Sequence, residues 1–226
     1  MFIGHFGVAL AAERAAPRAS LGTLFFATQL PDFLWAMLLL ANIEHVRIAP
    51  GTTRVSPFDF YDYPASHSFL AALAWSALVM ICYFMARRYP GGSWLLGLFV
   101  LSQWILDFVV HRPDLALWPG GPRVGLGLRN SVVGSVAAEL LIFGTGLWIY
   151  LAPTKPTDTI GIYGFWSLMI VVFLGWVSSL FAGPPPGITS LAWGGIAMGL
   201  TVPWGAWADS YRTMQSQTAV THPASA

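Results

Sequence analysis

Six acidic or imidazole side chains lie inside, or at the ends of, segments that are otherwise apolar: His5, Asp32, His67, Asp107, His111 and Glu139. An ionisable group at membrane depth is costly unless it pairs, faces a polar cavity or binds an ion. The chain has only ten acids and five histidines, so six such placements call for a shared explanation. Because imidazole and carboxylate are ligands of zinc and similar metals, the pattern predicts a divalent metal site, with zinc as the expected ion.

The composition indicates which kind of protein must position these groups. The 226 residues are 56% hydrophobic and only 9% charged, whereas soluble domains carry about 25% charged residues. The net charge of +1 gives no bulk attraction to nucleic acid, and the single cysteine excludes a disulfide framework. We therefore expect a polytopic membrane protein with no nucleic-acid partner.

A membrane-spanning helix requires about 20 mainly apolar residues. Six segments meet or nearly meet this length, and they cover residues 20–41, 66–86, 93–111, 131–151, 160–182 and 191–208. Residues 2–12 are apolar but too short to span. The expected fold is an all-α membrane helical bundle of about six transmembrane helices plus a short N-terminal half-helix. It forms one domain over residues 1–212, followed by a disordered polar tail over residues 213–226.

Local signals refine these limits. Ser66, Ser93 and Ser131 stand near the starts of three segments and are candidate N-caps. Pro31, next to Asp32, is expected to interrupt the first long helix.

Antiparallel alternation predicts that several of the six side chains meet at one end of the bundle. His67 opens the second long segment, while Asp107 and His111 lie near the end of the third, which returns to the same face. Asp107 and His111 are four residues apart and share one side of a helix. Asp32 and Glu139 are expected at greater depth, and His5 reaches a similar depth if its short helix rises from the same loop.

Each of these residues also has a simpler interpretation. Asp107 and His111 could form a helical ion pair, and Asp32 could cap the second half of a broken helix. His67 could face lipid headgroups, His5 could make only a packing contact, and Glu139 could be a protonated acid bonded to a main-chain carbonyl. These simpler interpretations require five separate local explanations, whereas one shared metal site explains all of the placements.

Four motifs follow one another in order over residues 1–111: His5-Phe6-Gly7, Leu30-Pro31-Asp32, Ser66-His67-Ser68-Phe69 and Asp107-Phe108-Val109-Val110-His111. In these motifs the first half of the chain resembles the bacterial inner-membrane-bound metal-dependent hydrolases. The ligand types are similar to those of zinc-dependent phospholipases C. Two departures are that Phe33-Leu34-Trp35 follow Pro-Asp, where a second Asp is usual, and that Tyr63-Pro64-Ala65 replace His-Arg-Gly. The missing acid and the missing basic pair argue against a second metal ion, and the missing acid also favours a non-catalytic protein.

The resemblance implies a multi-pass protein of the bacterial inner membrane that hydrolyses a lipid-linked ester, most simply a phosphoester. A divalent ion, expected to be zinc, would be held by the metal ligands His5, Asp32, His67, Asp107 and His111. Beyond the part of the chain that carries the resemblance, we expect Glu139 to be the general base or else a further ligand, and Arg112 and Arg129 to hold the phosphate. Two alternatives remain open: a non-catalytic accessory subunit that binds other membrane subunits, and a proton or metal-ion transporter.

Overall fold

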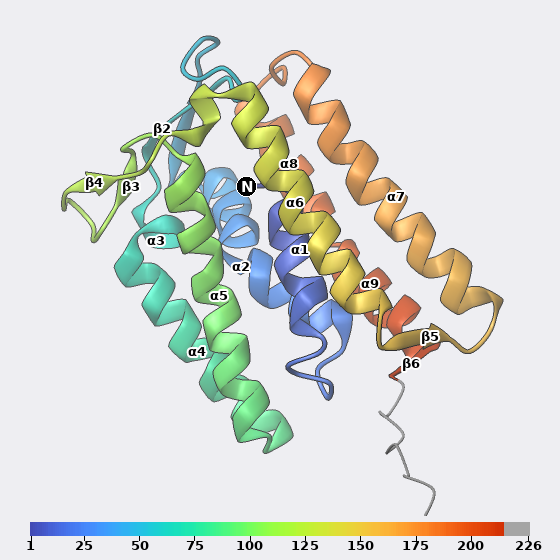
Figure 1. Ribbon diagram of the computed structural model, residues 1–226. Helices are drawn as coiled ribbons and strands as arrows, with labels where there is room; N and C mark the ends of the chain where they lie inside the picture. The colour runs from blue at the N-terminus through green and yellow to red at the C-terminus, as the bar shows by residue number, and fades with distance from the viewer. Residues whose placement is uncertain (215–226) are drawn as a thin grey trace, which may run out of the picture.

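The computed structural model describes residues 1–214 and is dominated by helices (Figure 1). Five of them are long and apolar enough to cross a membrane: α2 (Leu21–Leu40), α4 (Phe69–Arg87), α5 (Pro90–Val110), α6 (Val132–Leu151) and α7 (Thr159–Phe181). The expected all-α helical bundle is confirmed, and these five helices indicate a membrane protein.

The sixth expected span is divided into two shorter helices. α8 (Ile188–Met198) ends at Gly199, and α9 (Thr201–Ser210) begins two residues later. Both pack against α2. Neither is long enough to cross a membrane alone, so the region expected as one helix over residues 191–208 is a broken pair.

The short helix expected near the N-terminus is α1 (Ile3–Ala12), which lies in the centre of the bundle (Figure 1). It packs most closely on α6. A Cβ atom added to Gly146 would lie 2.0 Å from the carbonyl oxygen of Gly7, and one added to Gly7 would lie 2.5 Å from that of Ile142. The two helices therefore touch backbone to backbone, as small residues allow in membranes.

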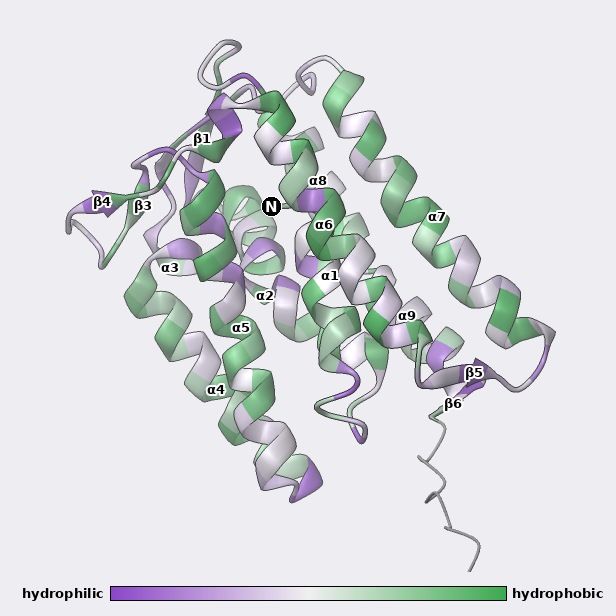
Figure 2. Ribbon diagram, viewed as in Figure 1, coloured by the Kyte–Doolittle hydropathy of each residue, from purple (hydrophilic) through white to green (hydrophobic). Residues whose placement is uncertain are grey.

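The outer helices present apolar faces (Figure 2). In α4 only Ala72 is buried, although the helix is almost entirely apolar. Such a surface suits lipid rather than water, because soluble proteins rarely expose an apolar surface that continues along a whole helix. The polar residues gather in the loops and in the interior near α2 and α5 (Figure 2).

Short two-stranded antiparallel sheets lie at the two ends of the bundle. β1 (His45–Ile48) pairs with β2 (Phe58–Asp62), and β3 (Leu115–Ala116) pairs with β4 (Arg123–Val124). These lie at the same end as the single-turn helix α3 (Pro64–His67) and the 3₁₀ turn η1 (Leu128–Asn130). At the other end, β5 (Thr154–Pro156) pairs with β6 (Arg212–Met214). The strand β6 includes residues 213 and 214 of the expected tail, and residues 215–226 lie outside the described part.

Three of the expected local signals are wrong and one is confirmed. α2 continues through Pro31, whose ring is buried in the bundle. Ser131 caps α6 by accepting a hydrogen bond from Gly134. Ser93 lies inside the first turn of α5, and Ser68, in place of Ser66, caps α4.

Candidate metal centre

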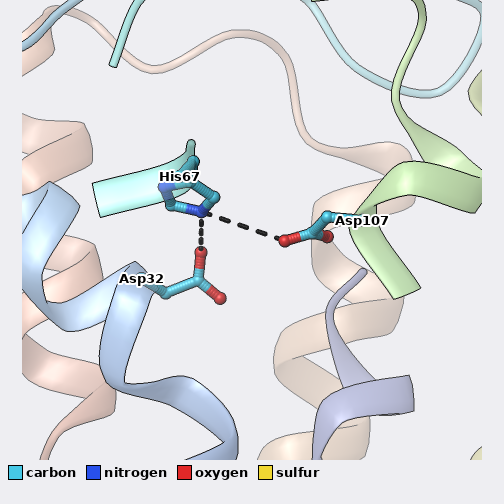
Figure 3. Close-up of side chains that lie close together, drawn as sticks. All are labelled: Asp32, His67 and Asp107. Atoms are coloured by element: carbon cyan, nitrogen blue, oxygen red, sulfur yellow. Dashed lines mark ion pairs between the residues drawn. The ribbon is translucent and has the colours of Figure 1, made fainter. Parts of the chain in front are cut away.

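Three side chains from three helices meet near the end of the bundle that carries β1–β4. Asp32 comes from α2, His67 from the end of α3, and Asp107 from α5 (Figure 3). One ligand atom of each residue lies within 4.8 Å of the other two. We call these three residues the central triad. A carboxylate–imidazole–carboxylate group of this size could hold a divalent metal ion.

The spacing within the central triad fits ligands around an ion better than a hydrogen-bonded network. Nε2 of His67 lies 3.4 Å from Oδ1 of Asp32 and 3.8 Å from Oδ2 of Asp107. N–H···O hydrogen bonds are shorter, about 2.7–3.2 Å. Two ligand atoms each about 2.0–2.1 Å from a tetrahedral ion are roughly 3.3–3.4 Å apart. The first distance matches this value and the second is slightly wider.

Local structure explains why these positions converge. α2 and α5 both run towards the end that carries β1–β4 (Figure 1), and Asp107 lies one turn before the end of α5. α3 stops at His67 because Ser68 is extended, with ψ 153°, and caps α4. His67 is therefore held at the mouth of the bundle, above the two acids.

The three side chains of the central triad differ in their exposure. The side chains of His67 and Asp107 are buried, whereas that of Asp32 is 38% exposed. Catalytic metal sites keep one position open to substrate, while structural sites are closed. The exposure of Asp32 is what an open site requires.

His67 is oriented by two residues that sequence reasoning missed. Oε1 and Oε2 of Glu44 accept hydrogen bonds from the main-chain nitrogen (2.8 Å) and the hydroxyl (2.5 Å) of Ser66. The same hydroxyl lies 2.7 Å from Nδ1 of His67. This contact leaves Nε2 directed at the two acids, which is the usual way in which metal-ligating histidines are held. In the sequence, the one sign of this role was that Ser66 directly precedes the candidate ligand His67.

The electrostatic environment of His67 is negative. Burial opposes protonation of the imidazole, but the nearby carboxylates of Asp32, Asp107 and Glu44 outweigh it and raise the pKa of His67 above its usual value. The site therefore favours a positive charge at Nε2, which a proton or a metal ion can supply.

His5 lies beside the central triad but is not one of its members. Its Nε2 is 3.4 Å from Oδ1 of Asp107, the oxygen that the α-amino group of Met1 also contacts. Neither ring nitrogen of His5 has a hydrogen-bond partner among the described residues, although the side chain is buried.

His111, expected as a ligand, is directed to a different set of partners. Its Nδ1 lies 2.9 Å from Oδ1 of Asp114 and 3.3 Å from the hydroxyl of Tyr63, and its Nε2 lies 2.8 Å from Nη1 of Arg129. His111 is the C-cap of α5 and its amide nitrogen still donates to the carbonyl oxygen of Asp107 at 2.8 Å, but its two ring nitrogens are bound by these other partners. Burial and the charge of Arg129 lower the pKa of His111 to about 4. Asp114 was not foreseen from the sequence.

Glu139, expected as the general base, binds the main chain of α1. Its Oε1 and Oε2 accept hydrogen bonds from the amide nitrogens of Phe2 (2.8 Å) and Gly4 (2.7 Å). The first amides of a helix lack partners within that helix and carry partial positive charge. Glu139, on α6, therefore caps the start of α1. Both of its carboxylate oxygens accept hydrogen bonds, whereas the protonated acid considered from the sequence would donate one to a carbonyl oxygen.

The two arginines expected to hold phosphate lie at the mouth and are already paired. Arg112 contacts Asp59, and its Nε lies 3.3 Å from Oδ2 of Asp114. Arg129 binds His111, and its guanidinium lies 5.6 Å from the ring centroid of Phe60. Arg129 makes one polar side-chain bond, which leaves further donors of its guanidinium for an anion.

Comparison of the chain with family models, with curated proteins and with solved structures gives no match. The central triad, with its partners Glu44 and Ser66, is therefore the main guide to function.

Proposed function

We propose that this protein is a membrane-embedded hydrolase that uses a divalent metal ion, with zinc expected, to cleave a lipid-linked ester, most simply a phosphoester. The observation that carries the proposal is the central triad, whose ligand atoms lie within 4.8 Å of one another. The half-exposed Asp32 and the membrane setting support a substrate that arrives from the lipid. The resemblance over residues 1–111 adds the bacterial inner membrane as the location.

The residues present fit such an ion. Asp32, His67 and Asp107 would hold it, and Glu44 and Ser66 would keep His67 in the ligating orientation. When bound, a divalent ion supplies polarisation of the ester and activation of water.

The mouth of the site supplies groups for an anionic substrate and for a proton. Arg129 is the anion-binding group with unused donors, and a phosphate that drew it away would release Nε2 of His111. The Nδ1–H of His111 would remain directed at Asp114, an arrangement that orients a neutral imidazole as a proton acceptor. We assign proton transfer to His111 in place of Glu139, whose two oxygens are bound to α1.

The test uses the full chain purified in detergent and reconstituted with phosphoesters of diacylglycerol and of polyprenol. Wild type is expected to contain near-stoichiometric metal by elemental mass spectrometry and to release phosphorylated product. Asp32→Asn should lose both, whereas the control Asp62→Asn, in the exposed hairpin, should keep both. Metal-free wild type, or full turnover in Asp32→Asn, would refute the proposal.

A specific observation also favours the non-catalytic alternative. The α-amino group of Met1 already lies against Asp107, so this carboxylate has a positive partner without a metal ion. An accessory membrane subunit with a purely polar core would then bind no metal. In that case Asp107→Asn would lower stability, and no substrate in the panel would be cleaved.

A further inference from the structure

Asp107 offers its two oxygens to two different histidines. Oδ2 lies 3.8 Å from Nε2 of His67, and Oδ1 lies 3.4 Å from Nε2 of His5. His5 does not belong to the central triad, in which the ligand atoms are mutually within 4.8 Å. A carboxylate shared in this way is suited to bridge two metal ions, which in two-metal sites lie about 3.5–4 Å apart.

His5 is a buried side chain whose ring nitrogens make no hydrogen bond within residues 1–214. Only 1% of it is exposed, and both ring nitrogens lack a hydrogen bond among the described residues. Buried polar groups are nearly always paired, and an exception needs an explanation such as an absent water or ion. The 3.4 Å between Nε2 and Asp107 again matches two ligands of one ion better than a hydrogen bond.

A layer of unpaired amide groups lies one turn deeper than the two aspartates. Gln103 precedes Asp107 by four residues on the same face of α5, is 0% exposed, and has neither Oε1 nor Nε2 paired within residues 1–214. Gln29 precedes Asp32 by three residues in α2, and its Nε2 is also unpaired. α2 and α5 run in the same direction (Figure 1), so both amides lie below the acids. An amide oxygen is a suitable ligand for a divalent ion.

We propose that the centre binds two divalent ions bridged by Asp107. The first is held by the central triad, and the second by Oδ1 of Asp107, Nε2 of His5 and the amide oxygen of Gln103. The inference rests on the proposed function for the first ion, and it reverses the single-ion expectation drawn from the sequence.

Charge also bears on this second position. The α-amino group of Met1 contacts Oδ1 of Asp107, so a second ion bound at this oxygen would have to displace that group. Two divalent ions against the two carboxylates of Asp32 and Asp107 leave an excess of positive charge. Such a centre attracts an anionic substrate, which points to a phosphoester in preference to a neutral carboxylic ester.

The test loads the purified full chain with Mn²⁺ and measures metal content together with the electron paramagnetic resonance spectrum. Wild type should bind two Mn²⁺ per chain and give the signal of an exchange-coupled pair. His5→Ala should bind one, with an uncoupled signal. His45→Ala, in an exposed hairpin where His45 binds Asp62, is the matched control and should behave as wild type.

Substitutions of Gln103 keep the proposal testable if His5→Ala fails to fold. Gln103→Leu should weaken the second Mn²⁺ by at least ~10-fold. Gln103→Glu, which retains an oxygen ligand, should keep the coupled signal.

The outcomes separate the two proposals. One Mn²⁺ in wild type, unchanged in His5→Ala and lost in Asp32→Asn, would overturn the second position and leave the hydrolase proposal intact. Two coupled ions in His5→Ala, or full retention in Gln103→Leu, would overturn the ligand set. No Mn²⁺ in wild type would refute both proposals.

Discussion

Replacement of Glu139 distinguishes a structural anchor from a catalytic base. The carboxylate accepts two hydrogen bonds from the start of α1, at 2.8 Å and 2.7 Å. In Glu139→Ala both amides of α1 lose their partner inside the bundle. Each buried donor left unpaired costs about 1–3 kcal/mol, so we expect a loss of about 2–6 kcal/mol in the free energy of unfolding.

Glu139→Gln gives a graded result. The amide has one acceptor oxygen and places N–H groups against the second amide of α1. About half of the loss, roughly 1–3 kcal/mol, is therefore expected. The central triad does not include Glu139, so the first metal ion should remain bound in this variant.

The assay is unfolding in mixed micelles, followed by tryptophan fluorescence, with metal content measured on the same samples. Asp62→Asn is the control, because this acid is 47% exposed and lies in the β1–β2 hairpin. Its effect should stay within about 0.5 kcal/mol. Wild-type stability in Glu139→Gln combined with lost hydrolysis would show that Glu139 acts on substrate, and our assignment of an anchoring role would be wrong.

Three further results are expected. Glu44→Gln should lower metal affinity about 10–100-fold in chelator competition, because Ser66 and then His67 lose their orientation. The pKa of His111 is about 4 in the folded protein, compared with 6.5 for an unperturbed histidine. At pH values between 4 and 6.5 the unfolded chain therefore binds more protons than the folded protein. Wild type should therefore lose roughly 3 kcal/mol of stability as pH falls from 6.5 to 4, and His111→Gln should lack this slope. Burial, and then the charge of Asp209, raise the pKa of Glu13 from 4.5 to about 8. The folded state therefore holds the proton of Glu13 more tightly than the unfolded chain does, and stability should fall as pH rises from 4.5 to 8. Glu13→Gln should remove this fall. If wild type and Glu13→Gln show the same dependence of stability on pH, the raised pKa of Glu13 is wrong.

The helices could be predicted because lipid imposes a strong and local constraint. Apolar segments of about 20 residues mark α2, α4, α5, α6 and α7 to within a few residues. The exact first and last residues of the helices were harder to predict, because they depend on how the adjoining loops fold. Ser66 was a reasonable cap from its position, but α3 inserts one turn and moves capping to Ser68. This shift is what leaves Ser66 able to bind His67.

The central triad could be anticipated because charged groups in apolar helices are rare and need partners. The rest of the centre depends on tertiary contacts. The ring of His111 is bound by Asp114 and Arg129. The carboxylate of Glu139 is bound by the main chain at the start of α1. Gln103 was missed because a neutral amide in an apolar helix carries no charge penalty that would draw attention to it.

The contact between Glu139 and α1 also has a consequence for biosynthesis. The hydrogen bond to Gly4 joins positions 135 residues apart, and at 5–20 residues per second the ribosome needs on the order of 10 s to cover that distance. Until α6 enters the membrane, α1 has no partner for its first amides and no glycine-lined surface to dock on. The Glu139 anchor of α1 is therefore added only after α2, α3 and α5 have brought the central triad together. A ribosome-bound chain that stops before α6 should hold the central triad, with α1 packed on α2 and α5 but without its anchor, so the position of α1 is fixed in two stages separated in time.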